Sequence, residues 1–433
     1  MAGRLSRAHS ILLLLLALAL VFFLSLANLQ LASDDLAWLQ GRPPTVFDQY
    51  RVVPRLFFVT LHALFGPSAV AALGMIWLFH ALNGLLAYRL GRAWLGDEVP
   101  ALVAAAVVLI NPVTLNTLTW ISCFSYVQGT TLALLALLAG WRAVGAEGGQ
   151  RAGWAAVALA CYGTGLLASH EILFLPVLFA LAGWLGGARR LGALLLVLGL
   201  GLGLAVNWLV YDFGRYGVEA TRLFSPDFAL AYASSGLSAG LALALAYPLS
   251  FLAPVLDFLQ LSFAGPVRWG LTGLLLAAAP LLYRRDRAWR LDLSLALAFL
   301  ALITPYVIRL YLTPESVNYH ISYALSGRVF YLAFVAVALG LGRAVSALAR
   351  RLARWRYGRL ALALPLAAYL HALWLYDRAD FLGLSVVHGA AAPAPPRWNP
   401  YAGPQPWLWP LLAAAAAALA AGLAAVTGRR PAD

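Results

Sequence analysis

Long apolar runs without a single charged side chain are the feature that most restricts how this chain can fold. Residues 11–26, 101–110 and 191–204 contain no Asp, Glu, Lys, Arg or His. Only 11% of the 433 residues are charged and 63% are hydrophobic, whereas a soluble domain carries roughly 25% charged residues. One soluble core cannot cover so much apolar surface, but a lipid bilayer can accommodate it. The sequence therefore predicts an all-α polytopic membrane protein.

Hydrophobic segments of spanning length recur along the whole chain. One apolar stretch, 229–264, is interrupted by Pro248, Pro254 and Asp257, and it forms either a hairpin of two spans or a pair of interfacial helices. We therefore expect a bundle of about 12–14 transmembrane helices. The twelve clear spans are 9–29, 69–90, 99–117, 121–141, 153–169, 172–187, 191–211, 267–283, 291–312, 328–348, 359–377 and 407–427.

The positive charge of the chain lies mainly on one side of the expected bundle. All 30 basic residues are arginine, and with the N-terminus inside, the cytoplasmic segments hold 20 of them but only 6 of the 17 acids. Because cytoplasmic loops are enriched in positive charge, we expect both termini in the cytoplasm. The arginine-only, Ala- and Gly-rich composition indicates a GC-rich bacterial genome and hence the cell (inner) membrane. The arginines lie in short loops rather than on one basic face, which argues against nucleic acid as a partner.

The first outer loop, residues 30–68, contains an acidic pair, Asp34-Asp35, directly after Ser33. A serine followed by two acids is typical of a helix start, where the hydroxyl caps and the acids meet the positive end of the dipole. Chemistry at the membrane surface is an equally good interpretation of these residues by themselves. Because neighbours on a helix do not share a face, only one of the two acids can point into a given cavity.

A short surface helix is expected later in the same loop. Pro54 is tolerated in the first turn of a helix, and Gly66-Pro67 is typical of a helix end. About twelve residues at a rise of about 1.5 Å extend over roughly 18 Å, which is too short to cross a bilayer. We therefore expect Arg55–Phe65 to lie along the outer membrane surface.

Few other polar residues stand at the outer ends of the spans. His170-Glu171 forms a short turn between two spans, and such a pair either orients a phosphate or sugar hydroxyl or is simply solvated. Arg328 stands at the entrance of a span, where a guanidinium either binds phosphate or extends to lipid headgroups. Within a span, His80 and Asn83 lie one helical turn apart, and packing between helices explains them about as well as a function does.

Six short motifs follow one another in order over residues 10–345. They are Asp34-Asp35 after the first span, Tyr50-Arg51 before Pro54, Phe79-His80-Ala-Leu-Asn83, Asn111-Pro112-Val113 with Trp120-Ile121-Ser122, Ser169-His170-Glu171 before Pro176, and Gly327-Arg328-Val-Phe-Tyr331. In this order and topology they resemble the GT-C superfamily, whose multi-span glycosyltransferases use polyprenyl-phosphate sugars. The most similar branch is the protein O-mannosyltransferase-like one. The chain departs from it at Asn111-Pro112, where relatives often show His-Pro, and in having no tetratricopeptide tail.

The resemblance implies that Asp34 acts as base toward an acceptor hydroxyl, or holds a metal that does so, with Asp35 as the supporting acid. A base toward the acceptor and cations toward the phosphate leaving group are what such a transfer requires. The residues implied for the donor phosphate or sugar lie at the outer ends of the spans: Arg328, His170, Glu171, Arg51, Arg55 and Tyr50.

The implied partners are a polyprenyl-phosphate sugar donor, membrane lipids and an extracytoplasmic acceptor. No cofactor follows from the residues themselves, and a divalent cation (Mg or Mn) at Asp34 is the one that the resemblance allows. We expect a catalytic module at residues 1–348 and further membrane helices at 349–433, with a Pro-rich outer loop at 378–406. Two other functions stay open: an inactive scaffold of the same fold, and a lipid or solute transporter. The lack of mid-span carboxylates and of an inverted repeat argues against the transporter.

Overall fold

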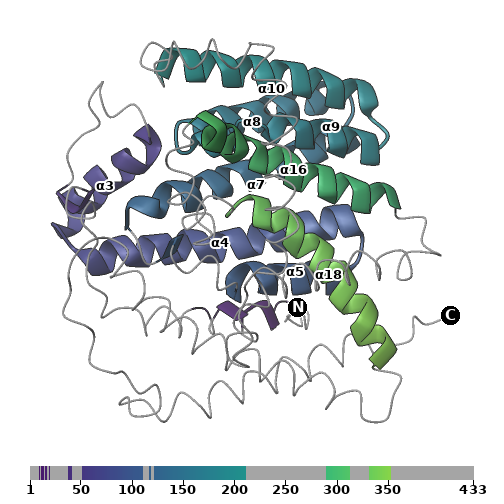
Figure 1. Ribbon diagram of the computed structural model, residues 1–433, viewed down its shortest axis with the longest axis horizontal. Helices are drawn as coiled ribbons and strands as arrows, with labels where there is room; N and C mark the ends of the chain where they lie inside the picture. The colour runs from purple at the N-terminus through teal and green to yellow at the C-terminus, as the bar shows by residue number, and fades with distance from the viewer. Residues whose placement is uncertain are drawn as a thin grey trace.

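The structure is a computed structural model of the chain. It describes residues 51–110, 121–210, 289–312 and 331–352, together with residues 9, 11–13, 15, 16, 19, 38–40, 117 and 118. Every regular element in this part of the chain is a helix (Figure 1). The prediction of an all-α fold is therefore confirmed for the described residues.

The observed helices follow the predicted spans to within a few residues, and residues 111–116 of the predicted span 99–117 lie outside the described residues. The longer elements are α3 (Val52–Phe65), α4 (Ala69–Leu95), α5 (Glu98–Ile110), α7 (Phe124–Gly145), α8 (Gly148–Leu166), α9 (Leu175–Leu185), α10 (Arg189–Val210), α16 (Trp289–Leu312) and α18 (Ala333–Leu352). Two single 3₁₀ turns, η2 (Ile121–Cys123) and η3 (His170–Ile172), precede α7 and α9. Five predicted segments lie outside the described residues, namely 229–264, 267–283, 359–377, 378–406 and 407–427, and the predicted span 9–29 is described only in part.

Three of the described helical segments are long and apolar enough to cross a membrane: Ala69–Leu95, Ile121–Gly145 and Arg189–Val206. These segments differ in burial. In Ile121–Gly145, which contains α7, 83% of the most apolar part is buried, whereas in Arg189–Val206 of α10 only 22% is buried. α7 is therefore central, and α10 is peripheral, with exposed apolar side chains such as Val197 available to lipid. Together with the charge-poor composition, these helices make the chain an integral membrane protein.

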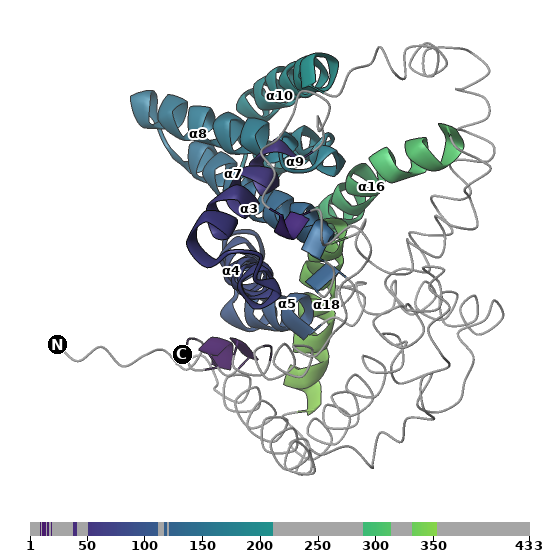
Figure 2. The ribbon, with the colours of Figure 1, turned by 90° about the vertical axis from the view of Figure 1, so that its left-hand side faces the viewer.

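The helices pack around α7. α7 lies against α8 on one side and α4 on the other, and α5 fills the angle between α4 and α18 (Figure 2). α16 connects α18 to α9, and α10 covers α8 and α9. α9 and α10 approach closely because both have glycine at the contact: a Cβ on Gly183 would lie 2.7 Å from the Cα of Gly192. Small residues allow this close approach. Within lipid, which is itself apolar, close van der Waals packing rather than the hydrophobic effect drives the association of helices.

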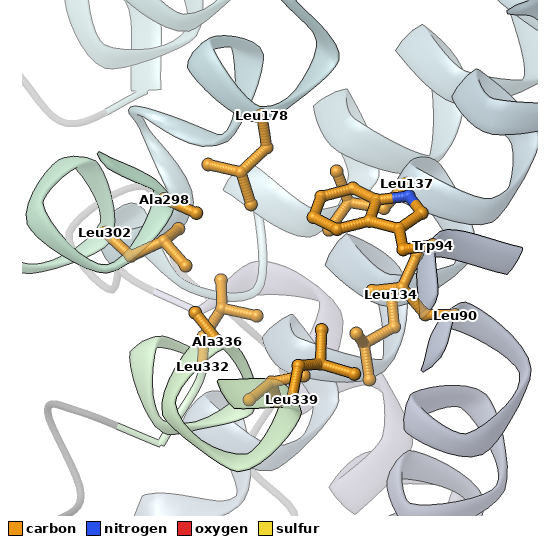
Figure 3. Close-up of a pocket in the computed structure, with 11 residues that line it drawn as sticks. Leu90, Trp94, Leu134, Leu137, Leu178, Ala298, Leu302, Leu332, Ala336 and Leu339 are labelled. Atoms are coloured by element: carbon orange, nitrogen blue, oxygen red, sulfur yellow. The ribbon is translucent and has the colours of Figure 1, made fainter. Parts of the chain in front are cut away.

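A small cavity lies between α4, α7, α9, α16 and α18 (Figure 3). Its volume is about 10 Å³, enough for roughly one water molecule. The surfaces that line it are apolar, and they come from Leu90, Trp94, Leu134, Leu137, Leu178, Ala298, Leu302, Leu332, Val335, Ala336 and Leu339. A substrate site needs a few polar groups to orient its ligand, so we interpret this cavity as a packing void.

A buried hydrogen-bond network joins the central helices, and it begins at His80. The Nε2 atom of His80 lies 3.1 Å from the Leu109 carbonyl oxygen, and Nδ1 bonds the Tyr331 hydroxyl. Because a carbonyl can only accept, Nε2 of the neutral imidazole carries the proton, and Nδ1 accepts from Tyr331. His80 thus binds the carbonyl of Leu109, near the end of the described part of α5.

The network continues from Tyr331 to α7 through Asn83. The Asn83 amide donates to the Val127 carbonyl oxygen at 2.9 Å and to the Tyr331 hydroxyl at 3.4 Å. Its own oxygen accepts from the Thr131 hydroxyl at 2.7 Å. All these side chains are buried and each has its partner, so the network links α4, α5, α7 and the start of α18. Of the two interpretations of His80 and Asn83, the structure favours helix packing.

The two ends of the bundle can be told apart by the residues and elements that they carry. Arg92 and Glu98 form an ion pair of 3.2 Å where α4 ends and α5 begins, and Arg343 pairs with Asp292 at 3.4 Å. This is the end that charge distribution predicts to be cytoplasmic. The opposite end carries α3, η2 and η3, with α3 at the left of Figure 1 beside the first turns of α4. The described candidate residues lie at this second end.

Candidate functional site

The surface helix α3 begins earlier than expected. It starts at Val52 rather than Pro54, so Pro54 occupies the third position, where a missing N–H costs no intrahelical bond. Its 14 residues extend over about 21 Å, less than the thickness of a bilayer. Phe58 on one side is buried against the bundle, whereas Leu64 and Phe65 are 69% and 62% exposed. This apolar outer side fits the expected position at the membrane surface.

Arg51 caps the start of α3 in an unusual conformation. Its φ of 80° and ψ of 41° place it in the left-handed region, which residues other than glycine seldom adopt. The Arg51 carbonyl accepts from the Arg55 backbone N–H at 3.1 Å, which closes the first turn of the helix. The Arg51 guanidinium donates through Nη1 to the Ser122 carbonyl oxygen at 3.0 Å. The strained backbone thus turns this side chain toward the start of α7.

Arg51, directly before α3, and Arg55, within it, both lie over the same aromatic ring. The Arg55 guanidinium carbon is 4.6 Å from the centre of the Trp38 ring, and that of Arg51 is 5.9 Å from it and 5.5 Å from the Tyr126 ring. Distances below about 6 Å allow cation–π attraction. We refer to Arg51, Arg55, Trp38 and Tyr126 as the arginine–aromatic cluster. Sequence reasoning selected both arginines but missed both rings.

Further aromatic contacts fix the cluster to the bundle. Phe58 of α3 contacts Trp38 at 5.2 Å and Phe124 at 5.6 Å between ring centres, and Phe124 contacts Phe79 of α4 at 5.1 Å. These edge-to-face contacts are a favourable geometry for aromatic rings. The rings hold α3 against the outer ends of α4 and α7, so the positions of the two arginines depend on the fold.

The turn before α9 lies beside the cluster. The Val53 backbone N–H donates to the Leu167 carbonyl oxygen at 3.3 Å, which joins the first turn of α3 to the segment that leads into η3. η3 contains His170 and Glu171, as the sequence predicts, and it packs against α7, α8 and α16. Glu171 is half-buried. The structure therefore brings the arginines of α3 and the turn with Glu171 to one end of the molecule.

Not every predicted site residue can be placed. Four of them, Asp34, Asp35, Tyr50 and Arg328, lie outside the described residues, so their convergence with the cluster stays a prediction. For His170 the structure describes the backbone only. Within the described part of the chain, no group of three or more His, Cys, Asp or Glu side chains could hold a metal ion. The cation at Asp34 therefore also stays a prediction.

Comparisons with known proteins give one structural match. No protein-family model matches the chain, and no curated protein matches its sequence. Among solved structures, the crystal structure of ArnT from Cupriavidus metallidurans bound to undecaprenyl phosphate matches with 14% sequence identity and a TM-score of 0.44. The match covers 96% of this chain and 75% of the ArnT chain.

Proposed function

We propose that this protein is a membrane glycosyltransferase of the GT-C type, which moves a sugar from a polyprenyl-phosphate carrier to an acceptor outside the cell membrane. The observation that carries the proposal is the arginine–aromatic cluster at the start of a surface helix, beside the turn with Glu171. Such a position suits a lipid whose charged head lies at the membrane surface and whose chain lies within the bilayer. The order of the sequence motifs supports the same reaction class.

The donor phosphate would bind to Arg51 and Arg55. A guanidinium matches the geometry of phosphate oxygens and remains charged at all relevant pH values. The positive end of the α3 dipole adds to this attraction within the first helical turn. The apolar outer side of α3, including Leu64 and Phe65, would place the arginines at the level of lipid headgroups.

In the proposed reaction, Asp34 takes the proton of the acceptor hydroxyl as the acceptor oxygen bonds to the anomeric carbon. The bond from that carbon to the phosphate oxygen breaks, and its electron pair leaves with the polyprenyl phosphate. The leaving phosphate gains negative charge, which Arg51, Arg55 and Arg328 would stabilise. Asp35 would support the base, and the turn with His170 and Glu171, together with Tyr50, would bind the sugar.

The membrane position follows from the same proposal. The site end faces away from the cytoplasm, and both termini lie in the cytoplasm, as the arginine distribution indicates. The protein O-mannosyltransferase-like specificity is a finer proposal that rests on the sequence motifs alone. A divalent cation, if used, would be held by Asp34, and the steps above do not depend on it.

The proposal is tested with purified protein in lipid nanodiscs. Undecaprenyl-phosphate hexoses with a labelled sugar are added with candidate peptide, glycan and lipid acceptors, and labelled product is measured. We expect transfer by the natural protein, its loss in Asp34→Asn, and donor binding weakened at least tenfold in the double variant Arg51→Gln, Arg55→Gln. Arg190→Gln, an exposed arginine on α10 at the other end, is the matched control and should bind and transfer normally. Donor binding without transfer to any acceptor would favour the inactive scaffold.

A further inference from the structure

Two buried polar side chains near the start of α7 each hold an atom without a hydrogen-bond partner among the described residues. The unpaired atoms are the Oγ of Ser125 and, in the Gln128 amide, the Oε1 alone. The side chains are only 1% and 2% exposed, respectively. We refer to Ser125 and Gln128 as the polar pair. Buried polar groups are satisfied in the great majority of cases, so an unpaired pair requires an explanation.

The face of α7 that carries the polar pair packs against the end of α8 and against Ser169, which directly precedes η3. A Cβ on Gly129 would lie 2.7 Å from Ser169 Cβ, and one on Gly165 would lie 3.3 Å from Leu132 Cβ. Gly129 and Leu132 follow Ser125 by four and seven residues and therefore lie on the same helix face. Gln128, four residues before Leu132, lies at the edge of this face, so both members of the polar pair adjoin the side of α7 that contacts Ser169.

The arginine–aromatic cluster adjoins the same region. Arg51 donates to the Ser122 carbonyl oxygen, which is about one helical turn, roughly 5 Å, before Ser125. The Val53 N–H bonds the Leu167 carbonyl oxygen in the segment that the polar pair faces. A sugar linked directly to a phosphate carries its hydroxyls at a comparable distance from the phosphorus. The spacing between cluster and pair therefore suits one sugar phosphate.

The polar pair is costly to the unliganded protein. A buried amide oxygen without a donor loses its hydration and gains nothing in return, so an apolar residue of the same size is more stable at such a position. Thr131 on the same helix shows the contrast, because its hydroxyl bonds Asn83 and the Val127 carbonyl. A position that keeps an unpaired amide oxygen is typical of a site that acquires its partner from a ligand.

We propose that Gln128 and Ser125 bind hydroxyl groups of the sugar on the donor lipid and thereby select which sugar is transferred. This inference rests on the proposed function, and it assigns residues that the sequence motifs do not contain. Gln128 accepts from one sugar hydroxyl through Oε1, and Ser125 bonds a second one. Because both atoms are covered without ligand, the segment from Gly165 to Ser169 moves off this face of α7 when the donor binds.

Binding to nanodisc-embedded protein tests the assignment with two probes, undecaprenyl phosphate and undecaprenyl-phosphate hexoses of differing configuration. In the natural protein we expect at least one hexose lipid to bind more tightly than the bare lipid phosphate. Gln128→Leu should remove that difference, about 10–100-fold in Kd, and leave the affinity for undecaprenyl phosphate unchanged. If the preference for the hexose lipid persists in Gln128→Leu, the inference is wrong while the proposed function stands.

Thermal unfolding without ligand separates a binding role from a structural one. Gln128→Leu should raise the melting temperature or leave it unchanged, because it removes a buried oxygen, Oε1, that has no donor in the unliganded protein. Thr131→Val, the control on the same helix, should lower it, because bonds that are made are lost. A lower melting temperature for Gln128→Leu with an unchanged hexose preference would instead indicate a buried water held by the polar pair, and would overturn the inference.

The failure of the proposed function has a different signature. If the natural protein binds neither undecaprenyl phosphate nor any hexose lipid, and Arg51→Gln changes nothing, both proposals are wrong. If it binds both lipids equally, the donor-phosphate site stands and the assignment of the polar pair falls.

Discussion

Arg51 combines a left-handed backbone with a guanidinium that contacts three groups. A left-handed conformation costs a non-glycine residue roughly 1–2 kcal/mol, and glycine would adopt it without strain. The Ser122 hydrogen bond and the contacts with Trp38 and Tyr126 offset this cost within the protein. Glycine would remove the strain, so the backbone conformation does not explain why arginine stands here. The contacts of the arginine side chain, beside the proposed phosphate site, explain it.

Replacing Arg51 by Gly should therefore separate stability from binding. The gain from relieved strain and the loss of the hydrogen bond and ring contacts are each about 1–2 kcal/mol, so the free energy of unfolding should change by less than about 1 kcal/mol. Affinity for undecaprenyl phosphate should fall about tenfold or more, because a charge-assisted bond is lost. Denaturant titration and lipid binding measure the two quantities. An unchanged affinity would remove Arg51 from the phosphate site.

Tyr331 allows a second test at the residue scale. Tyr331→Phe keeps the ring but leaves His80 Nδ1 without a donor and removes an acceptor of Asn83, which should cost about 1–3 kcal/mol of unfolding free energy. The control is Tyr88→Phe, whose hydroxyl makes a long, 3.4 Å bond to Glu98 at the end of the bundle and should matter by less than about 0.5 kcal/mol. Equal effects in the two variants would contradict a cooperative buried network.

At the scale of elements, local sequence signals predicted which helices form but not how their ends meet. The surface helix was expected from Pro54 and Gly66, and Gly66 does end it with its N–H bonded to the His62 carbonyl at 2.8 Å. Its start at Val52 was not predicted, because the left-handed cap at Arg51 depends on the Ser122 carbonyl, 71 residues away. Such a contact has no local signature in the sequence.

The glycine at 129 provides a prediction for the contact between α7 and the turn with Glu171. In Gly129→Ala the new Cβ would lie 2.7 Å from Ser169 Cβ, which is too close without movement of the segment. We expect a loss of about 1–3 kcal/mol in unfolding free energy. Gly74→Ala in α4, where nothing lies within 4 Å of the new Cβ, should instead stabilise by about 0.5–1 kcal/mol. Denaturant titration compares the two, and destabilisation in both would point to a general intolerance of substitution.

For the whole molecule, hydropathy predicted the membrane class and the helices, because both depend on local composition. It did not predict which spans are central, since every span is similarly apolar in sequence. The most apolar parts of α7 and α10 have similar mean hydropathies, 1.6 and 1.8, but protein surrounds the first and the second lies at the edge of the bundle. The same limit applies to the site. Arg51 and Arg55 were predicted because they are cations in the first outer loop. Trp38, Tyr126 and the polar pair were not predicted, because their roles arise from helix packing.

The central and peripheral positions of these helices should be visible in matched leucine truncations. Leu134 of α7 is fully buried and lines the small cavity, so Leu134→Ala removes contacts that no other group replaces and should cost about 2–4 kcal/mol. Leu198 of α10 is 48% exposed, and because lipid fills the space left by Leu198→Ala, the cost should stay below about 1 kcal/mol. Unfolding of both variants by a denaturing detergent in mixed micelles measures the difference. Similar losses for the two leucines would mean that α10 is covered by protein rather than by lipid, because only buried packing contacts carry the larger cost.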